Sequence, residues 1–370
     1  MSFSIDVSWK SLNKYQEELC GDKVEILKTE DSDIVILADG MGSGVKANIL
    51  ATLTSKILGT MLREGASIES CVETVAKTLP VCSVRGVAYA TFSILQIFHS
   101  GEAYLAEFDN PSCVYIREGR IVKYPYEVRE IEGKKVREYR FRVEKNDCFV
   151  LMSDGVIYAG AGSILNLQGW TWEAMSEYTL KCTKKTLSAS RLAVMLCQAC
   201  DELYEERPGD DTTVAVARVI ERRVVSIFTG PPARKEDDVR IMHDFMNGEG
   251  KKVVSGGTSA NIAARILKKK IVTKADTGNP DVPPMAVIEG IDLVTEGVLT
   301  LGKCLKLLRK YVRGEFDTEF FDELDADNGA SRLARLLIEE CTELNLFVGT
   351  AVNEAHKETE LNFDLSMRQN

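Results

Sequence analysis

The sequence predicts an α+β fold in which two β-sheets are covered by helices on their outer faces, followed by a smaller α/β domain. Residues 89–152 contain many short strand patterns separated by turns, which is typical of antiparallel sheets. Pairs of amphipathic helical patterns flank them at residues 46–79 and 172–205. After about Arg222 the order changes to strand, helix, strand, which indicates a second domain of different architecture.

The first domain is assigned to residues 1–221 and begins with strands and helices in alternation. Val24–Leu27 and Ile34–Ala38 are strand patterns, and apolar residues at helical spacing predict helices over Lys46–Glu64 and Ile68–Leu79. A meander follows, with turns rich in Gly, Pro, Asn and Asp between its strands: Tyr89–Phe98, Ala103–Phe108, Ser112–Ile116 and Arg120–Tyr124. The domain ends with further strands and helices: Glu138–Val143, Cys148–Met152, Trp172–Leu180, Ser188–Glu205 and Val214–Ala217.

The second domain, residues 222–370, is predicted to be a small α/β layer fold. Its expected strands are Val224–Phe228, Lys252–Ser255, Val287–Leu293 and Leu346–Val352. Its expected helices are Asp237–Asn247, Thr300–Val312 and Ala330–Leu344, and one more helix runs from Gly256 to Lys270. The first residues of that helix are a candidate anion-binding site, because free backbone N–H groups at a helix N-terminus attract anions: Gly256, Gly257, Thr258 and Ser259. An ordinary N-cap is the alternative.

Acidic residues recur beside the strand ends of the first domain. Asp39 follows the apolar run Ile34–Ala38, Asp154 follows Phe149–Ser153, and a pair precedes the last strand: Asp210 and Asp211. Asp22 lies a short hairpin away from Asp39. Carboxylates gathered at the rim of a sheet would raise each other's pKa unless a cation compensated them. A divalent metal is therefore expected.

The ligand chemistry favours magnesium or manganese over zinc. Oxygen-only ligands suit Mg²⁺ or Mn²⁺, and neither the three histidines nor the cysteines show zinc-ligand spacing. With these acids and the backbone carbonyl of Gly40, two ions could be bridged at roughly 3.5–4 Å. A single Asp-Gly pair is usually only a turn. A dinucleotide loop at Gly40, Gly42 and Gly44 is the other alternative, but the third glycine of that motif would fall at Val45.

Residues 1 to about 220 resemble the bacterial stage II sporulation protein E-type branch of the metal-dependent (PPM) serine/threonine protein phosphatases. Four motifs occur in the order of that family: Gly21-Asp22, Asp39–Gly44, Ser153–Val156 and Asp210–Val214. The resemblance implies a four-layer α-β-β-α sandwich. It also implies metal ligands: Asp39 bridges both ions, Asp154 and Asp210 complete one site, and Asp22 with the Gly40 carbonyl serves the other. Asp211 is adjacent to Asp210 in the sequence and is an alternative to it as the metal ligand.

The implied activity is that of a protein-serine/threonine phosphatase, a phosphoric monoester hydrolase. A hydroxide bridging two Mn²⁺ or Mg²⁺ ions would attack the phosphorus of phosphoserine or phosphothreonine in line, with Asp39 and Asp154 as the catalytic residues. The family implies phosphorylated protein substrates in bacterial signalling, among them antagonists of anti-sigma factors. The alternative is a catalytically silent binding or scaffold protein whose C-terminal domain binds a nucleotide or a phosphorylated small molecule.

Composition sets the outer bounds of function. The chain has 370 residues, of which 45% are hydrophobic and 28% charged, so it can form two domains with proper cores. The net charge of −10 argues against a nucleic-acid partner. Neither an export signal nor a run of 18 or more apolar residues occurs, so a cytoplasmic protein without a membrane partner is expected. The ten cysteines are then expected to be reduced thiols.

Overall fold

The computed structural model describes residues 3–78, 90–131, 133–161, 169–273 and 285–351. The chain divides into two compact units, each described by itself below. The first comprises Met1–Arg222 and Phe316–Phe321, and the second comprises Arg223–Glu315 and Asp322–Asn370. The predicted domain limits, 1–221 and 222–370, stay predictions.

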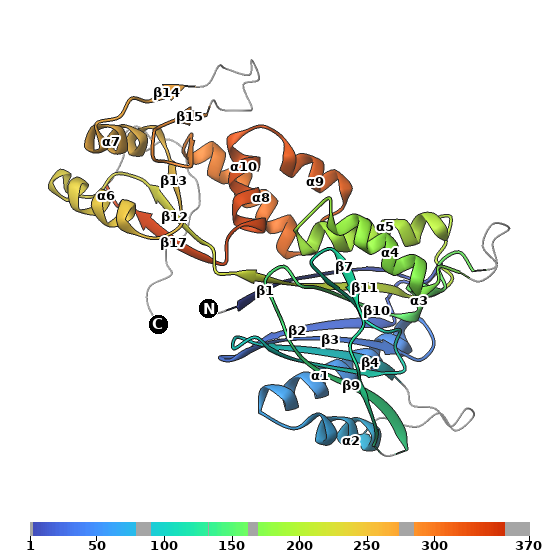
Figure 1. The fold of residues 1–370 in the computed structure, drawn as a ribbon. Coiled ribbons are helices and arrows are strands. Elements are labelled where there is room, and N and C mark those ends of the chain that lie inside the picture. The colour runs from blue at the N-terminus through green and yellow to red at the C-terminus, as the bar shows by residue number, and fades with distance from the viewer. Residues whose placement is uncertain (1–2, 79–89, 132, 162–168, 274–284, 352–370) are drawn as a thin grey trace. The chain divides into compact units, whose positions relative to one another are not determined.

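The first unit is a sandwich of two antiparallel sheets with helices on both outer faces (Figure 1). One sheet has the order β2-β3-β4-β5-β9-β8, with β2 Asp22–Lys28, β3 Ser32–Gly40, β4 Ala90–Phe98, β5 Glu102–Phe108, β8 Glu127–Ile131 and β9 Lys134–Arg142. The other has the order β1-β11-β10-β6-β7, with β1 Phe3–Leu12, β6 Val114–Arg117, β7 Arg120–Val122, β10 Cys148–Met152 and β11 Thr212–Glu221.

Two pairs of helices complete the four layers. Against the first sheet lie α1 Gly44–Arg63 and α2 Ile68–Thr78, and against the second lie α4 Trp172–Thr183 and α5 Ala189–Leu203. A single turn of helix, α3 Asp154–Ile157, follows β10. The predicted α+β sandwich with an α-β-β-α arrangement is therefore confirmed.

Strand β3 shows why the sandwich has three separate cores. Its side chains alternate between faces: Ile34 and Ile36 pack with helices α1 and α2, whereas Val35 and Leu37 pack between the two sheets. All four of these side chains are at most 1% exposed. Because both faces are covered, the strand is one unbroken apolar run, and it can hold a polar residue only at its end.

Strand β10 repeats this construction in the other sheet. Val150 and Met152 pack beneath α4 and α5, and Phe149 and Leu151 face the space between the sheets. The strand is buried throughout, and the chain becomes polar only at Ser153, directly after it. Both apolar runs thus deliver a polar residue to the rim of the sandwich.

The second unit contains a six-stranded sheet of order β14-β15-β16-β13-β12-β17. The strands are β12 Val224–Thr229, β13 Lys251–Ser255, β14 Val272–Thr273, β15 Ala286–Val287, β16 Leu293–Thr295 and β17 Glu343–Val348, and β16, β13, β12 and β17 pair in parallel. The helices are η1 Lys235–Asp237, α6 Asp238–Asn247, α7 Gly257–Leu267, α8 Val298–Val312 and α10 Gly329–Glu339. Helix α9 Thr318–Asp325 is divided, with residues 318–321 in the first unit and 322–325 in the second. The small α/β layer fold is therefore present. No helix in the described part of the chain has the length and apolarity of a bilayer span.

Several expected elements of this unit were wrong in their limits. Helix Ala330–Leu344 ends at Glu339, and the expected strand Leu346–Val352 is instead β17 Glu343–Val348, because residues from Glu343 onward pair in parallel with β12. The expected strand Val287–Leu293 is instead two short strands, because the backbone N–H of Ile291 donates to the Ile288 carbonyl and closes a turn between them. In both places apolar residues continue through a turn that the pattern alone does not reveal.

Candidate metal centre

Strand pairing brings Asp22 and Asp39 together. The two residues are direct partners in the antiparallel register of β2 and β3. The backbone N–H of Gly40 donates to the carbonyl of Gly21 at 3.1 Å, which closes the ladder just beyond the pair. A Cβ atom at Gly40 would lie 2.1 Å from the carbonyl oxygen of Ala47, so only glycine lets α1 pack this closely.

The other sheet presents Asp154 and the pair Asp210 and Asp211. Strands β10 and β11 are antiparallel neighbours, so the start of α3 after β10 lies beside the start of β11. The backbone N–H of Thr213 donates to the Ser153 hydroxyl at 2.8 Å and fixes this junction. A Cβ atom at Gly155 would lie 2.2 Å from the Asp211 carbonyl oxygen, so the two segments are in backbone contact there.

The carboxylates of both sheets act on one another electrostatically. Burial is the largest cause that raises the pKa of Asp39 from 3.8 to about 9. The charges of four other carboxylates add to it: Asp22, Asp154, Asp210 and Asp211. Burial also raises the pKa of Asp22 to about 7, an effect that the nearby hydroxyls of Ser153 and Thr213 partly offset. The structure therefore gathers all five predicted acids at the same rim of the sandwich.

Asp154 and Asp211 are shifted in the same direction. Burial, and then the charge of Asp210, raise the pKa of Asp154. Burial likewise raises the pKa of Asp211, although one of its oxygens accepts a hydrogen bond from the backbone N–H of Lys14 at 3.0 Å. A rim at which several carboxyl groups resist ionisation has a strong affinity for any positive charge that enters it.

Unpaired oxygen atoms show where such a charge fits. Both carboxylate oxygens of Asp22 and Oδ2 of Asp211 are buried and have no hydrogen-bond partner among the described residues. Buried polar atoms without a partner are rare and call for a ligand. Three bare carboxylate oxygens suit a hard divalent cation such as Mg²⁺ or Mn²⁺. The residues present therefore fit the implied metal.

The carboxylates do not form a closed cage as they stand. Within the described ranges, no group of three or more His, Cys, Asp and Glu side chains is close enough to hold one ion. The acids are thus within electrostatic range but not at common ligand distance. The ligand roles assigned from sequence to Asp22, Asp39, Gly40, Asp154, Asp210 and Asp211 stay predictions, as do the catalytic roles of Asp39 and Asp154.

Asp210 and Asp211, which the sequence could not rank, differ in environment. The side chain of Asp210 is 40% exposed and lies 3.7 Å from Nζ of Lys14. Its Oδ1 also accepts a hydrogen bond from the backbone N–H of Asp211. Asp211 is only 4% exposed, and its free Oδ2 points toward Gly21, the residue before Asp22. Asp211 therefore faces the Asp22 side of the rim.

Sequence analysis missed several residues beside the acids. Lys14, which follows β1, contacts both Asp210 and Asp211, but β1 was not assigned because its apolar residues are spaced by Ser, Asp and Lys. Ser43, before α1, donates its hydroxyl to Glu17 at 3.0 Å. The hydroxyl of Tyr204 donates to the Gly155 carbonyl at 2.6 Å. Only Ser43 offered a usable signal, because it lies inside the motif Asp39–Gly44.

The candidate anion site lies in the second unit. Helix α7 begins at Gly257, and its N-cap Gly256 (φ +107°) provides no side-chain cap. Ser259 is 1% exposed, and its hydroxyl has no partner among the described residues. That hydroxyl lies 3.7 Å from the place of a Cβ at Gly256, which directs it toward the start of the helix. The anion-binding role of Gly256, Gly257, Thr258 and Ser259 stays a prediction.

Comparisons with known proteins bear on the first unit. The family model described as Stage II sporulation protein E (SpoIIE) matches residues 29–220. The solved PP2C phosphatase domain of SpoIIE from Bacillus subtilis, with a fragment of its regulatory domain, is 19% identical, with a TM-score of 0.51 over 59% of this chain and 64% of that one. The match thus spans less than two thirds of that structure.

Other solved structures are similar at lower scores. The RsbU and RsbW domains of a Mycobacterium tuberculosis protein are 16% identical, with a TM-score of 0.48 over 66% of this chain and 69% of theirs. RsbX in complex with magnesium is 20% identical, with a TM-score of 0.41 over 58% of this chain and 95% of that one. No curated protein matches the chain.

Proposed function

The chain belongs to the stage II sporulation protein E (SpoIIE) family, and on this premise we propose that it is a metal-dependent protein phosphatase. Its substrate is phosphoserine or phosphothreonine on a partner protein. The observation that carries the proposal is the group of carboxylates from both sheets, which raise one another's pKa and leave buried oxygens unpaired. A protein that only binds or scaffolds gains nothing from such mutual repulsion.

The proposed metal ligands come from both sheets. Asp39 lies within electrostatic range of the acids of both sheets and would contact both ions. Asp22 and the Gly40 carbonyl would hold an ion on the side formed by β2 and β3. Asp154 with Asp210 or Asp211 would hold an ion on the side formed by β10 and β11. Two Mn²⁺ or Mg²⁺ ions, when bound, would lower the pKa of a water and neutralise the phosphoryl oxygens.

The site needs no side-chain nucleophile. Cys20 lies beside Asp22 and Asp211, and burial and Asp22 raise the pKa of its thiol to about 12, so it stays protonated and a poor nucleophile at neutral pH. The carboxylates would instead hold the ions that activate the attacking water. The partner class follows from the family: a phosphorylated signalling protein, with antagonists of anti-sigma factors as the first candidates.

The test is hydrolysis of p-nitrophenyl phosphate and of a phosphoserine peptide with Mn²⁺. Asp39→Asn should lower kcat/KM at least about a hundredfold, because it removes the bridging carboxylate. Asp33→Asn is the matched control: it lies on the same strand, its buried carboxylate faces the opposite end of the ladder, and it should leave kcat/KM within about threefold of wild type.

Equal activity of wild type and Asp39→Asn would remove the catalytic assignment. Mn²⁺ binding measured by calorimetry on the same proteins separates loss of metal from loss of chemistry. Should wild type bind Mn²⁺ but hydrolyse neither substrate, the chain would be a silent member of its family and the scaffold alternative would replace the enzyme.

A second candidate function belongs to the second unit, where the unpaired Ser259 hydroxyl favours a phosphorylated small molecule or nucleotide. First-turn N–H groups of α7 have no partner within the helix, and a Cβ at Gly257 would meet no atom of the described residues within 4 Å, which leaves room for a phosphate. Inorganic phosphate, AMP and ATP should raise the thermal unfolding temperature of the full chain and of Ser226→Ala, another buried serine, but not of Ser259→Ala. Equal shifts in all three proteins would remove this site.

A further inference from the structure

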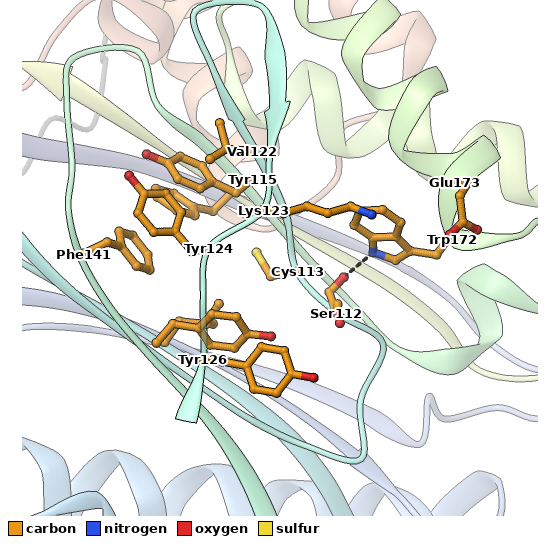
Figure 2. A pocket seen from close by; sticks show the side chains of 13 residues that line it. Ser112, Cys113, Tyr115, Val122, Lys123, Tyr124, Tyr126, Phe141, Trp172 and Glu173 are labelled. Atoms are coloured by element: carbon orange, nitrogen blue, oxygen red, sulfur yellow. Dashed lines mark hydrogen bonds between the residues drawn. The ribbon is translucent and has the colours of Figure 1, made fainter. Parts of the chain in front are cut away.

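A cavity of about 360 Å³ lies inside the first unit, away from the carboxylates (Figure 2). One side is formed by residues of β5 and β9, such as Leu105 and Tyr139, and the other by residues of β6, β7 and β10, such as Tyr115 and Phe149. The cavity therefore lies between the two sheets. None of the five acids of the candidate metal centre lines it.

The wall on one side is a block of stacked aromatic rings. Tyr115 stacks on Phe149 with ring centroids 4.4 Å apart and planes at 14°, and it stacks on Tyr124 and Phe141 at 5.4 and 5.5 Å. The Tyr115 hydroxyl donates to Asp147 at 2.7 Å, which orients its ring. These rings are held before any ligand arrives, so a planar molecule would meet a preformed aromatic wall.

Different residues form the opposite wall and the opening. Tyr126 lies 5.4 Å from Tyr139, and it is 52% exposed. The indole N–H of Trp172 donates to the Ser112 carbonyl at 2.7 Å, and Lys123 places its ammonium 5.4 Å from the indole ring. Lys123, Tyr126 and Glu173 are exposed lining residues and mark the opening to solvent. The rim thus carries one charge of each sign, which favours an uncharged ligand.

Cys113 stands between the two groups of rings, as Figure 2 shows for Tyr124 and Phe141 on one side and Tyr126 on the other. Buried Glu107 fixes this arrangement: it accepts hydrogen bonds from the Cys113 backbone N–H at 2.6 Å and from the Tyr139 hydroxyl at 3.0 Å. Arg137 pairs with the same carboxylate at 3.2 Å. Both walls are therefore tied to one buried acid.

We propose that this cavity is a binding site for an uncharged planar aromatic molecule of two or three rings, independent of the proposed phosphatase activity. A dry cavity of about 150 Å³ suffices for benzene, so the volume here accommodates a larger ring system. Stacked rings favour an aromatic over a saturated ligand of the same size because of their quadrupoles. The Cys113 thiol, with its small side chain, leaves the centre of the cavity open.

The test is calorimetric titration of the full chain with 2-naphthol and with decahydro-2-naphthol, its saturated analogue. One site per chain is expected for 2-naphthol, with affinity at least about threefold higher than for the saturated analogue. Cys113→Phe fills the cavity and should weaken 2-naphthol binding tenfold or more. Val128→Phe adds a ring to exposed strand β8 outside the cavity and should bind like wild type.

A second variant, Tyr126→Ala, tests the same cavity in case Cys113→Phe does not fold. Tyr126→Ala removes an exposed ring of the wall and should leave the thermal unfolding temperature unchanged while weakening 2-naphthol binding about two- to tenfold. Three results would each overturn the proposal: absence of 2-naphthol binding to wild type, wild-type affinity in Tyr126→Ala, or equal affinity for the two naphthol analogues.

Discussion

Asp22 and Asp39 face each other directly across the antiparallel ladder of β2 and β3. Like charges at opposed positions of a ladder destabilise it, and here both oxygens of Asp22 are buried without a hydrogen-bond partner in the part of the chain that the structure describes. The same pair lies within electrostatic reach of three acids from the other sheet. The fold thus places several mutually repelling carboxylates together at one rim of the sandwich. A divalent cation is the simplest group that removes this repulsion.

Replacing Asp22 by Asn should stabilise the protein when metal is absent. Burial raises the pKa of Asp22 to about 7, so at pH 8 it carries an unpaired buried charge. The free energy of unfolding of Asp22→Asn in EDTA should exceed that of wild type by on the order of 1–3 kcal/mol, measured by urea denaturation. With Mn²⁺ the order should reverse. A variant less stable than wild type in EDTA would show that the carboxylate is already compensated.

Metal-free stability should fall as pH rises. The pKa of Asp39 is about 9 in the folded chain, against 3.8 for the ordinary group, so between these values the folded state binds a proton that the unfolded state has released. The free energy of unfolding therefore decreases with increasing pH through that window. In EDTA, the thermal unfolding temperature of wild type should drop by several degrees between pH 5 and pH 8.5. Asp39→Asn should show a flatter profile, and parallel profiles would contradict the assignment.

Manganese should stabilise the chain more at high pH than at low pH. Bound metal takes the place of protons on the carboxyl groups, so its apparent affinity rises as those protons become easier to displace. The Mn²⁺-induced increase in unfolding temperature should be larger at pH 8 than at pH 6, and Asp33→Asn should keep it. An increase of the same size at both pH values would place the ion elsewhere.

Gly40→Ala should be strongly destabilising. The added methyl would stand 2.1 Å from the Ala47 carbonyl oxygen, so α1 has to move away from β3. A loss of about 2 kcal/mol or more in the free energy of unfolding is expected. Gly209→Ala is the matched control, because its methyl would meet only a ring carbon of Tyr204 at 3.5 Å. Similar losses in the two variants would refute the tight packing of α1 against β3.

The ends of buried strands located the acids of the candidate site in the sequence, and their roles as ligands stay predictions. Asp39 lies at the end of β3 and Asp154 directly follows β10, and both strands are buried on both faces. The packing of the two sheets against each other brought these ends together, and each sheet depends on pairings remote in sequence, such as that of β1 with β11. No local pattern carries that information.

Polar strands and short turns account for the other differences. Strand β8, Glu127–Ile131, escaped assignment because it is an edge strand with four of its five residues at least partly exposed. Helix α9, Thr318–Asp325, is short and mostly acidic outside its two phenylalanines. The start of β17 was missed because apolar periodicity runs from α10 through Cys341 into the strand. In each case pairing or packing with remote residues decided the structure.

If carboxylates of both sheets hold two divalent ions on Asp39, the two ions share that carboxylate. Electron paramagnetic resonance of Mn²⁺ added to the full chain detects this arrangement, because two manganese ions that share a carboxylate give a spin-coupled signal. We expect that signal for wild type and for Asp33→Asn, and its loss in Asp39→Asn. An uncoupled Mn²⁺ spectrum that is the same in all three proteins would contradict the account.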